Sequence, residues 1–313
     1  MEYRRLGNSD LVVSEVSLGG NNFGRWADEP TSIAVINRAL SIGINYIDTA
    51  DVYGKGLSEE FIGKALRGKR SQVIIATKFG RGPVDGPADK GGSRQYIIRA
   101  LEASLRRLQT DCIDLYQFHV PDPVTPIEET LRTLDDLIKE GKVRYIGCSN
   151  FVSWQLCEAL WTSRVNNLQA FVTIQSRYNI IERQIEAELI PCCKAYGIGV
   201  IPWGPLAGGF LTGKYHQGEK APTDARLSGK TTIYDGYFTE GNWNKLAKLE
   251  SYAVDHGHTL AELAIAWLLA KPWVSTVIAG ARKIEQVTAN VAAANWKLTP
   301  REITEVEEIC LIG

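Results

Sequence analysis

Hydrophobic residues follow two alternating patterns along the chain. Short runs rich in Val and Ile, typical of buried strands, occur near residues 14–19, 43–48, 73–78, 113–118, 144–148, 171–175, 198–203 and 275–279. Longer segments between them carry apolar residues at every third or fourth position, as amphipathic helices do. These helices are expected near residues 31–43, 93–108, 126–141, 152–163, 183–196, 259–270 and 283–294.

Strand and helix alternate eight times, which predicts parallel strands joined by crossover helices. Eight such units in 313 residues favour a closed (β/α)8 TIM barrel, an α/β fold. The alternative is an open doubly wound sheet, but its G-x-G-x-x-G fingerprint is absent from the first turn, which reads LGGNNFGRW. No linker divides the chain, so residues 1–313 are expected to form a single domain. Residues 2–13 are expected to form a hairpin that closes the barrel bottom, and residues 204–245 a long loop after the seventh strand.

Composition and charge narrow the classes of partner. The chain has 35 basic and 36 acidic residues, so no net charge points to nucleic acid or to a membrane surface. No apolar run reaches the ~18–20 residues of a membrane span, and a cytoplasmic location is expected. The six cysteines form no C-x-x-C pair, so no metal site is expected.

Ionisable residues stand where the predicted strands end. Asp48 ends the second strand, Lys78 the third and His119 the fourth, and Tyr53 follows Asp48 by one loop turn. Because TIM-barrel active sites lie at the carboxyl ends of the strands, these four side chains are expected to meet. Later strand ends add Ser149, Asn150, Gln175, Trp203, Gly280 and Arg282.

The four residues suit proton transfer to a carbonyl oxygen. A free phenol has a pKa of about 10, and a nearby ammonium lowers it. Asp48 would hold Lys78 beside Tyr53, and His119 would hydrogen-bond the reacting oxygen. The carbonyl carbon must also receive a hydride, which a nicotinamide cofactor supplies and no side chain can.

Several motifs together resemble one family. They are GINYIDTADVYG, IIATKF, LYQFHVPDP, RYIGCSN, WGPLAGGFLTGKY and VIAGARKIEQVTAN. In these the chain resembles the aldo-keto reductase superfamily over essentially its whole length. Within it, the chain is most similar to the bacterial branch that also resembles potassium-channel β-subunits.

The resemblance implies a role for each matching residue. Tyr53 would be the general acid in reduction and the base in oxidation, Asp48 and Lys78 would tune it, and His119 would orient the carbonyl. The cofactor would be bound by Gly20, Asn21, Asp48, Ser149, Asn150, Gln175, Trp203, Gly204, Pro205, Leu206, Gly208, Leu211, Lys214, Gly280, Arg282, Gln286 and Asn290. The substrate would contact Tyr53, His119, Trp26 and Val120.

Arg282 decides the expected cofactor. Its guanidinium matches a 2′-phosphate, which favours NADP(H) over NAD(H). Two positions depart from the family pattern. Gly204 stands where Ser is common, and Ala289 stands where relatives often carry Glu near the adenine.

The expected function is therefore reversible hydride transfer between NADP(H) and an aldehyde, ketone or sugar. The partner would be a small carbonyl or alcohol, and the protein a monomer or weak homo-oligomer. One alternative is a cofactor-binding regulatory subunit with weak turnover, like the channel β-subunits. Another is a barrel of unrelated chemistry, such as an isomerase or lyase. Specificity is expected in the loops at residues 21–30, 53–57, 80–92, 120–124 and 215–243.

Overall fold

A sheet of eight parallel strands forms the centre of the molecule. The computed structural model describes residues 1–82, 90–223, 225 and 235–311. The strands are β3 Val16–Gly19, β4 Tyr46–Asp48, β5 Ile74–Phe79, β6 Ile113–Phe118, β7 Val143–Ser149, β8 Thr173–Arg177, β9 Gly199–Trp203 and β10 Val277–Gly280. They pair in the order β10-β3-β4-β5-β6-β7-β8-β9. A bridge between Val200 and Val274 joins the two edges, so the sheet is a nearly closed barrel and the predicted TIM barrel is confirmed.

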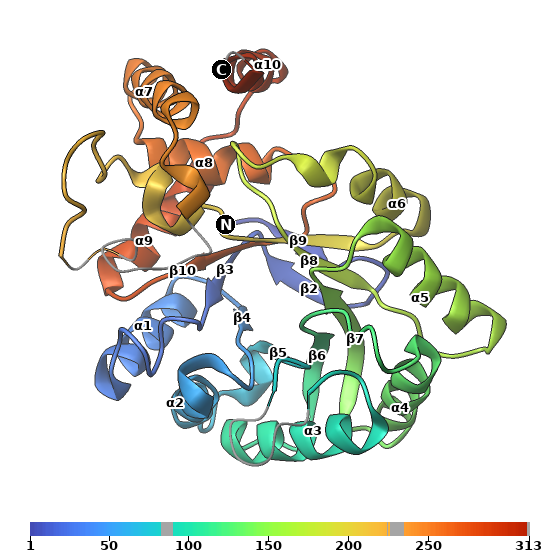
Figure 1. Ribbon diagram of the computed structural model, residues 1–313. Coiled ribbons are helices and arrows are strands. Elements are labelled where there is room, and N and C mark those ends of the chain that lie inside the picture. Colours follow the sequence, from blue (N-terminus) through green and yellow to red (C-terminus); the bar gives the residue numbers. More distant parts are fainter. Residues whose placement is uncertain (83–89, 224, 226–234, 312–313) are drawn as a thin grey trace.

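Helices surround this sheet (Figure 1). They are α1 Glu29–Ser41, α2 Leu57–Ala65, α3 Arg94–Leu108, α4 Ile127–Lys139, α5 Ser153–Val165, α6 Leu189–Tyr196, α7 Glu240–Asp255, α8 Leu260–Leu269, α9 Ile284–Ala292 and α10 Pro300–Leu311. In α4, Leu131, Leu134 and Leu137 form the buried stripe that the sequence pattern predicts. Helix α8 begins with a capping box, in which Thr259 and Glu262 each accept the other's backbone N–H.

The sequence pattern left out three of these helices. Helix α2 is the crossover that the parallel pairing of β4 with β5 requires, although residues 57–65 were not expected to be helical. Helix α7 shortens the expected 204–245 loop, because it begins at Glu240. Helix α10 packs on α7 at the edge of the barrel (Figure 1). Helix α6 starts later than expected, at Leu189, after a 3₁₀ turn at Gln184–Glu186.

The predicted hairpin is present at the amino ends of the barrel strands. Strands β1 Tyr3–Arg5 and β2 Val12–Ser14 pair antiparallel. Leu6, Leu11 and Val13 then pack against inward-facing side chains of the barrel, namely Tyr46, Ala76, Leu115, Ile201 and Ile278. The hairpin therefore closes one end of the barrel with an apolar layer.

The inward face of three strands changes from apolar to polar toward their carboxyl ends. Residues two apart on a strand share a face, so the apolar residue and the polar residue above it point to the same interior. These pairs are Tyr46 and Asp48 on β4, Ala76 and Lys78 on β5, and Leu115 and Gln117 on β6. The barrel is thus sealed below and polar above, and the polar end is where a site can form.

Candidate active site

Asp48 and Lys78 form a buried ion pair at the polar end of the barrel. Lys78 is fully buried and Asp48 is 2% exposed. Lys78 Nζ lies 2.5 Å from Asp48 Oδ1 and donates to the Thr49 carbonyl at 2.7 Å. Burial acts to lower the pKa of Lys78, but the Asp48 carboxylate and Tyr53 outweigh it and hold that pKa above its ordinary value. Lys78 is therefore an ammonium at neutral pH.

Two glutamines satisfy the other oxygen of Asp48. Gln175 Nε2 donates to Asp48 Oδ2 at 2.7 Å, and Gln117 Nε2 donates to it at 3.1 Å. A buried ion pair is stable only when its remaining hydrogen-bonding capacity is used, and these amides use it. Asp48 is thereby fixed in position beside Lys78.

Tyr53 lies next to this ion pair. It opens the short 3₁₀ segment η1, Tyr53–Gly56, and its hydroxyl is 3.5 Å from Lys78 Nζ. Burial raises the pKa of the Tyr53 phenol above its ordinary value, although Lys78 acts in the opposite direction. This corrects the expectation that the ammonium lowers that pKa overall, since burial has the larger effect. Tyr53 therefore keeps its proton at neutral pH and can act as a donor.

His119 faces Tyr53 from the end of β6. The two rings are 5.9 Å apart between centroids and meet at 82°. Burial, followed by the charges of Lys78 and Arg81, holds the pKa of His119 well below its usual range. The ring is therefore neutral, and no described residue hydrogen-bonds its buried Nδ1. A neutral imidazole has one N–H to offer to an acceptor beside Tyr53.

A chain of polar side chains extends from His119 across the ends of β7, β8 and β9. Asn150, in the left-handed region at φ 61°, donates to the His119 carbonyl at 2.9 Å. Trp203 Nε1 donates to Asn150 Oδ1 at 3.1 Å, and Ser149 Oγ donates to the Gln175 carbonyl at 2.8 Å. These bonds fix the amide and indole groups in place along one wall.

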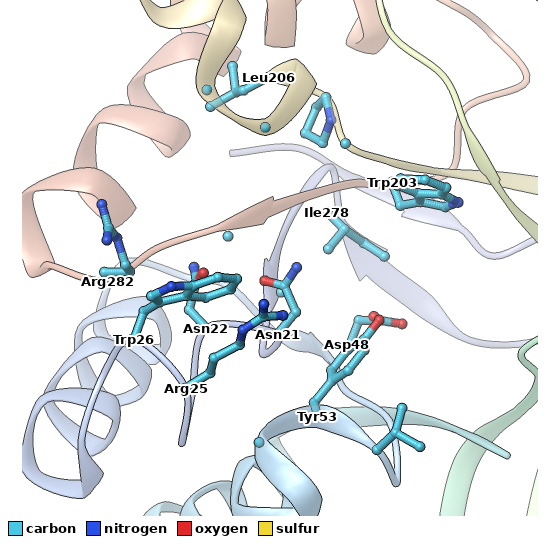
Figure 2. A pocket seen from close by; sticks show the side chains of 18 of the residues that line it. Asn21, Asn22, Arg25, Trp26, Asp48, Tyr53, Trp203, Leu206, Ile278 and Arg282 are labelled. Carbon is cyan, nitrogen blue, oxygen red and sulfur yellow. The ribbon is translucent and has the colours of Figure 1, made fainter. Parts of the chain in front are cut away.

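These residues line a cavity of about 930 Å³ (Figure 2). From the predicted set, its wall includes Asn21, Trp26, Asp48, Tyr53, His119, Ser149, Asn150, Gln175, Trp203, Gly204, Pro205, Leu206, Gly208, Lys214, Gly280, Arg282 and Gln286. The structure thus brings together residues that are far apart in the sequence, from Asn21 to Gln286.

Five predicted residues lie outside this wall. Lys78 is beneath the cavity floor, behind Asp48 and Tyr53. Leu211 belongs to the apolar core, and Asn290 is buried on α9. Gly20 is buried, and a Cβ there would lie 2.8 Å from Ser58 Oγ. Val120 is half-buried just after His119.

Three basic lining residues were not singled out from the sequence, although they lie in loops that were expected to set specificity. Arg25, Lys55 and Arg81 contribute to the cavity wall from the loops after β3, β4 and β5. Arg25 directly precedes Trp26, Lys55 is two residues after Tyr53, and Arg81 is three residues after Lys78. A count of basic residues in these loops could have found them.

The described residues give no sign of a metal centre or of a membrane span. They contain no group of three or more His, Cys, Asp or Glu side chains placed to hold a metal ion. None of the helices described is both long and apolar enough to cross a membrane.

Comparison with known proteins gives a consistent result. The model of the aldo/keto reductase family matches residues 15–310. A probable voltage-gated potassium channel subunit beta of Oryza sativa is 36% identical over 318 residues, covering 99% of this chain and 96% of that protein. The uncharacterized oxidoreductase YrpG of Bacillus subtilis is 37% identical, covering 99% and 96%. The aldo-keto reductase YhdN of the same bacterium is 36% identical, covering 99% and 93%.

Proposed function

The chain belongs to the aldo/keto reductase family and is an oxidoreductase of it, and we propose that it transfers a hydride reversibly between NADP(H) and the carbonyl carbon of an aldehyde, ketone or sugar. The observation that carries this proposal is the geometry of one proton donor. The Tyr53 hydroxyl lies 3.5 Å from a buried ammonium and faces a neutral imidazole at the wall of a large cavity. This arrangement suits protonation of an oxygen that becomes negative as its carbon is reduced.

The cavity fits a dinucleotide. Its volume of about 930 Å³ is at the upper end of ordinary ligand pockets. The segment after β9 has positive φ at Gly204, Ala207, Gly208 and Gly209. For Ala207 this conformation is strained, and such strain is found at ligand-binding loops. Ser149, Asn150 and Gln175 would hold the nicotinamide carboxamide, and Trp203 would contact its ring.

When bound, NADPH supplies the hydride, and the side chains supply the proton and the orientation. The neutral His119 donates a hydrogen bond to the carbonyl oxygen. Tyr53 gives its proton to the same oxygen, and Lys78 stabilises the phenolate that remains. Asp48 keeps Lys78 in place, with Gln117 and Gln175 on its second oxygen. In the oxidation direction the same phenolate takes the proton back.

Substitution of Tyr53 by Phe tests the proton donor. The Y53F variant should bind NADPH within about threefold of the wild-type Kd, because the hydroxyl acts on the substrate. Its kcat for reduction of an aldehyde should fall by about 10²–10⁴-fold. Nicotinamide fluorescence measures the binding, and absorbance at the nicotinamide band measures turnover. Full activity in Y53F would show that another group is the acid.

Arg282 supports the choice of NADP(H). Its side chain lines the cavity at the start of α9, and its backbone N–H donates to Gln286 Oε1 at 2.7 Å. The R282A variant should weaken NADPH binding by about tenfold or more and NADH binding much less, since only NADPH has the 2′-phosphate. Equal losses for both cofactors would contradict this role.

A second candidate function is a cofactor-binding regulatory subunit with weak turnover. It is favoured by the similarity to proteins named as channel β-subunits. The complete set of Asp48, Tyr53, Lys78 and His119 favours the enzyme instead. Tight NADPH binding without measurable turnover across a panel of aldehydes, ketones and sugars would support the regulatory subunit, and absence of NADPH binding would exclude both.

A further inference from the structure

The cavity wall carries a surplus of positive charge. Among the described lining residues, five are basic: Arg25, Lys55, Arg81, Lys214 and Arg282. The acidic one is Asp48, whose charge is already balanced by Lys78. Lys214 and Arg282 lie on the segments after β9 and β10, where the proposed function places the cofactor phosphates. The other three cations have no role in that scheme.

These three cations come from neighbouring parts of the barrel rim. Arg25, Lys55 and Arg81 follow β3, β4 and β5, which are adjacent in the sheet. In the part of the chain that the structure describes, no carboxylate forms an ion pair with any of them. Other buried or half-buried arginines do form ion pairs, as Arg70 does with Asp114 and Arg107 does with Glu59. Unpaired cations that converge on a cavity favour an anionic ligand.

Arg25 is held at the cavity by an aromatic neighbour. Its guanidinium carbon lies 4.0 Å from the ring centroid of Trp26. Figure 2 shows the two side chains together at the cavity, near Asn21 and Asn22. A guanidinium stacked on an indole keeps its N–H groups free along its edge, where a carboxylate or phosphate can accept them.

Arg81 lies close enough to the reacting end to act on it. Its charge contributes to the low pKa of His119, after burial and Lys78, and it opposes the effect of burial on the pKa of Tyr53. Arg81 also lines the cavity just after β5, the strand that carries Lys78 next to the Tyr53 hydroxyl, so it stands on the same side of the cavity as the proton donor.

We propose that Arg25, Lys55 and Arg81, together the cationic rim, select carbonyl substrates that carry an anionic group, a carboxylate or a phosphate. The anion would lie on the rim while the carbonyl oxygen meets Tyr53 and His119. This inference rests on the proposed function, because it names the substrate class of the same site. A carboxylate and a phosphate share a negative charge, and two pairs of substrates show which of these two groups the site prefers.

The test compares substrates that differ in charge. One pair is 4-carboxybenzaldehyde and 4-methylbenzaldehyde, and the other is glyceraldehyde 3-phosphate and glyceraldehyde. With saturating NADPH, kcat/KM for the anionic member of at least one pair should exceed that for the neutral member by about tenfold or more, which corresponds to ~1.4 kcal/mol. The pair with the larger ratio identifies carboxylate or phosphate as the group preferred.

Variants of the rim then locate the effect. In the double variant R25Q/R81Q, the ratio of kcat/KM for the anionic and neutral substrates should fall to near one. R81K keeps the charge and should retain most of the ratio. Arg67→Gln, on the exposed surface after α2, is the matched control and should leave both rates unchanged. The Kd for NADPH, measured by fluorescence, separates a loss of substrate binding from a loss of cofactor binding.

The contrary outcomes are distinct. A wild-type ratio near one in both pairs, or a preference that persists in R25Q/R81Q, overturns the inference. A rise in the NADPH Kd in R25Q/R81Q that accounts for the whole loss assigns the rim to the cofactor and also overturns it. If no aldehyde of either pair is reduced, while 4-methylbenzyl alcohol and glycerol are not oxidised, the proposed function itself fails.

Discussion

Two buried carboxylate–cation pairs lie on opposite faces of strand β5. Lys78 points into the barrel and pairs with Asp48, whereas its neighbour Thr77 points outward and donates to Glu59 Oε1 at 2.5 Å. Arg107 of α3 pairs with the other oxygen of Glu59 at 2.7 Å. Adjacent residues on a strand face opposite sides. The same strand therefore contributes Lys78 to the inner ion pair and a hydrogen bond from Thr77 to the outer one, and the two pairs lie on different sides of the sheet. Asp48 and Glu59 are 2% and 0% exposed, and burial therefore does not distinguish them.

The two pairs differ in what lies beside them. The inner pair borders a cavity, and its ammonium lies 3.5 Å from the Tyr53 hydroxyl. The outer pair is enclosed by α2, α3 and the sheet. Next to it, Asp51 is 3% exposed, and burial and the Glu59 charge raise its pKa to about 7. A perturbed carboxyl is thus found on the sealed side as well, so a shifted pKa marks an active site only when a cavity reaches the group.

The largest expected difference between the pairs is in catalysis. Lys78→Met should lower kcat for aldehyde reduction by about 10²–10⁴-fold, because Tyr53 loses the charge that stabilises its phenolate. Arg107→Met should leave the kcat of the folded protein within about threefold of wild type. Both variants should lose roughly 3–5 kcal/mol of unfolding free energy in urea, since each leaves a buried carboxylate unpaired.

Arg107→Lys covers the case in which Arg107→Met does not fold. It keeps a positive charge beside Glu59 and should retain both fold and activity. A large drop in kcat for a folded Arg107 variant with unchanged NADPH binding would mean that the outer pair also serves the chemistry, and the contrast between the two faces would then be wrong.

The inner pair could be predicted from the sequence and the outer pair could not. Asp48 and Lys78 end strands that the apolar pattern locates, and the carboxyl ends of parallel strands meet at one rim. Glu59 and Arg107 lie on two helices, and the sequence pattern missed α2. Their contact depends on how α2 and α3 pack, which no periodicity specifies.

The sequence predicted the cavity-wall residues after β7, β8, β9 and β10 better than those in the loops after β3 and β5. The motifs located the residues after β7, β8, β9 and β10, because their polar and glycine residues stand at strand ends. Arg25 and Arg81 lie within loops, where no period applies and the side-chain direction depends on the local turn. Parts of the loops expected to set specificity, residues 83–89, 224 and 226–234, lie outside the described residues.

Asp51 should make the outer face sensitive to pH. Its folded pKa of about 7 is above the ordinary value of 3.8, so the folded protein keeps a proton that the unfolded chain has lost. The stabilisation is complete below about pH 4 and is lost as pH rises through about 7. Asp51→Asn cannot titrate, so its unfolding free energy should decline less between pH 5 and pH 8, by roughly 2–3 kcal/mol relative to wild type.

Urea unfolding at several pH values measures this difference. The exposed Asp111 provides the control, since Asp111→Asn should follow the wild-type curve. If Asp51→Asn and wild type decline in parallel, Asp51 does not carry the proton, and the pH dependence of the fold has another source.

The smallest expected effect concerns the hydroxyl of Tyr96, which contacts residues near both faces of β5. Tyr96 Oη lies 3.3 Å from Asp51 Oδ2 in the outer cluster and accepts the Gly80 N–H at 3.2 Å. Arg81 of the cationic rim follows Gly80 directly, so Tyr96 fixes the start of its loop from behind. Tyr96→Phe should cost about 1 kcal/mol of unfolding free energy and lower the anionic-to-neutral kcat/KM ratio by less than about fivefold. Tyr3→Phe removes an exposed hydroxyl that donates to the Gly43 carbonyl and should leave that ratio unchanged. An unchanged ratio in Tyr96→Phe would mean that the outer cluster only supports the fold. A reduced ratio would mean that the outer cluster also positions Arg81. The two faces of β5 would then differ in their distance from the reaction and not in whether they contribute to it.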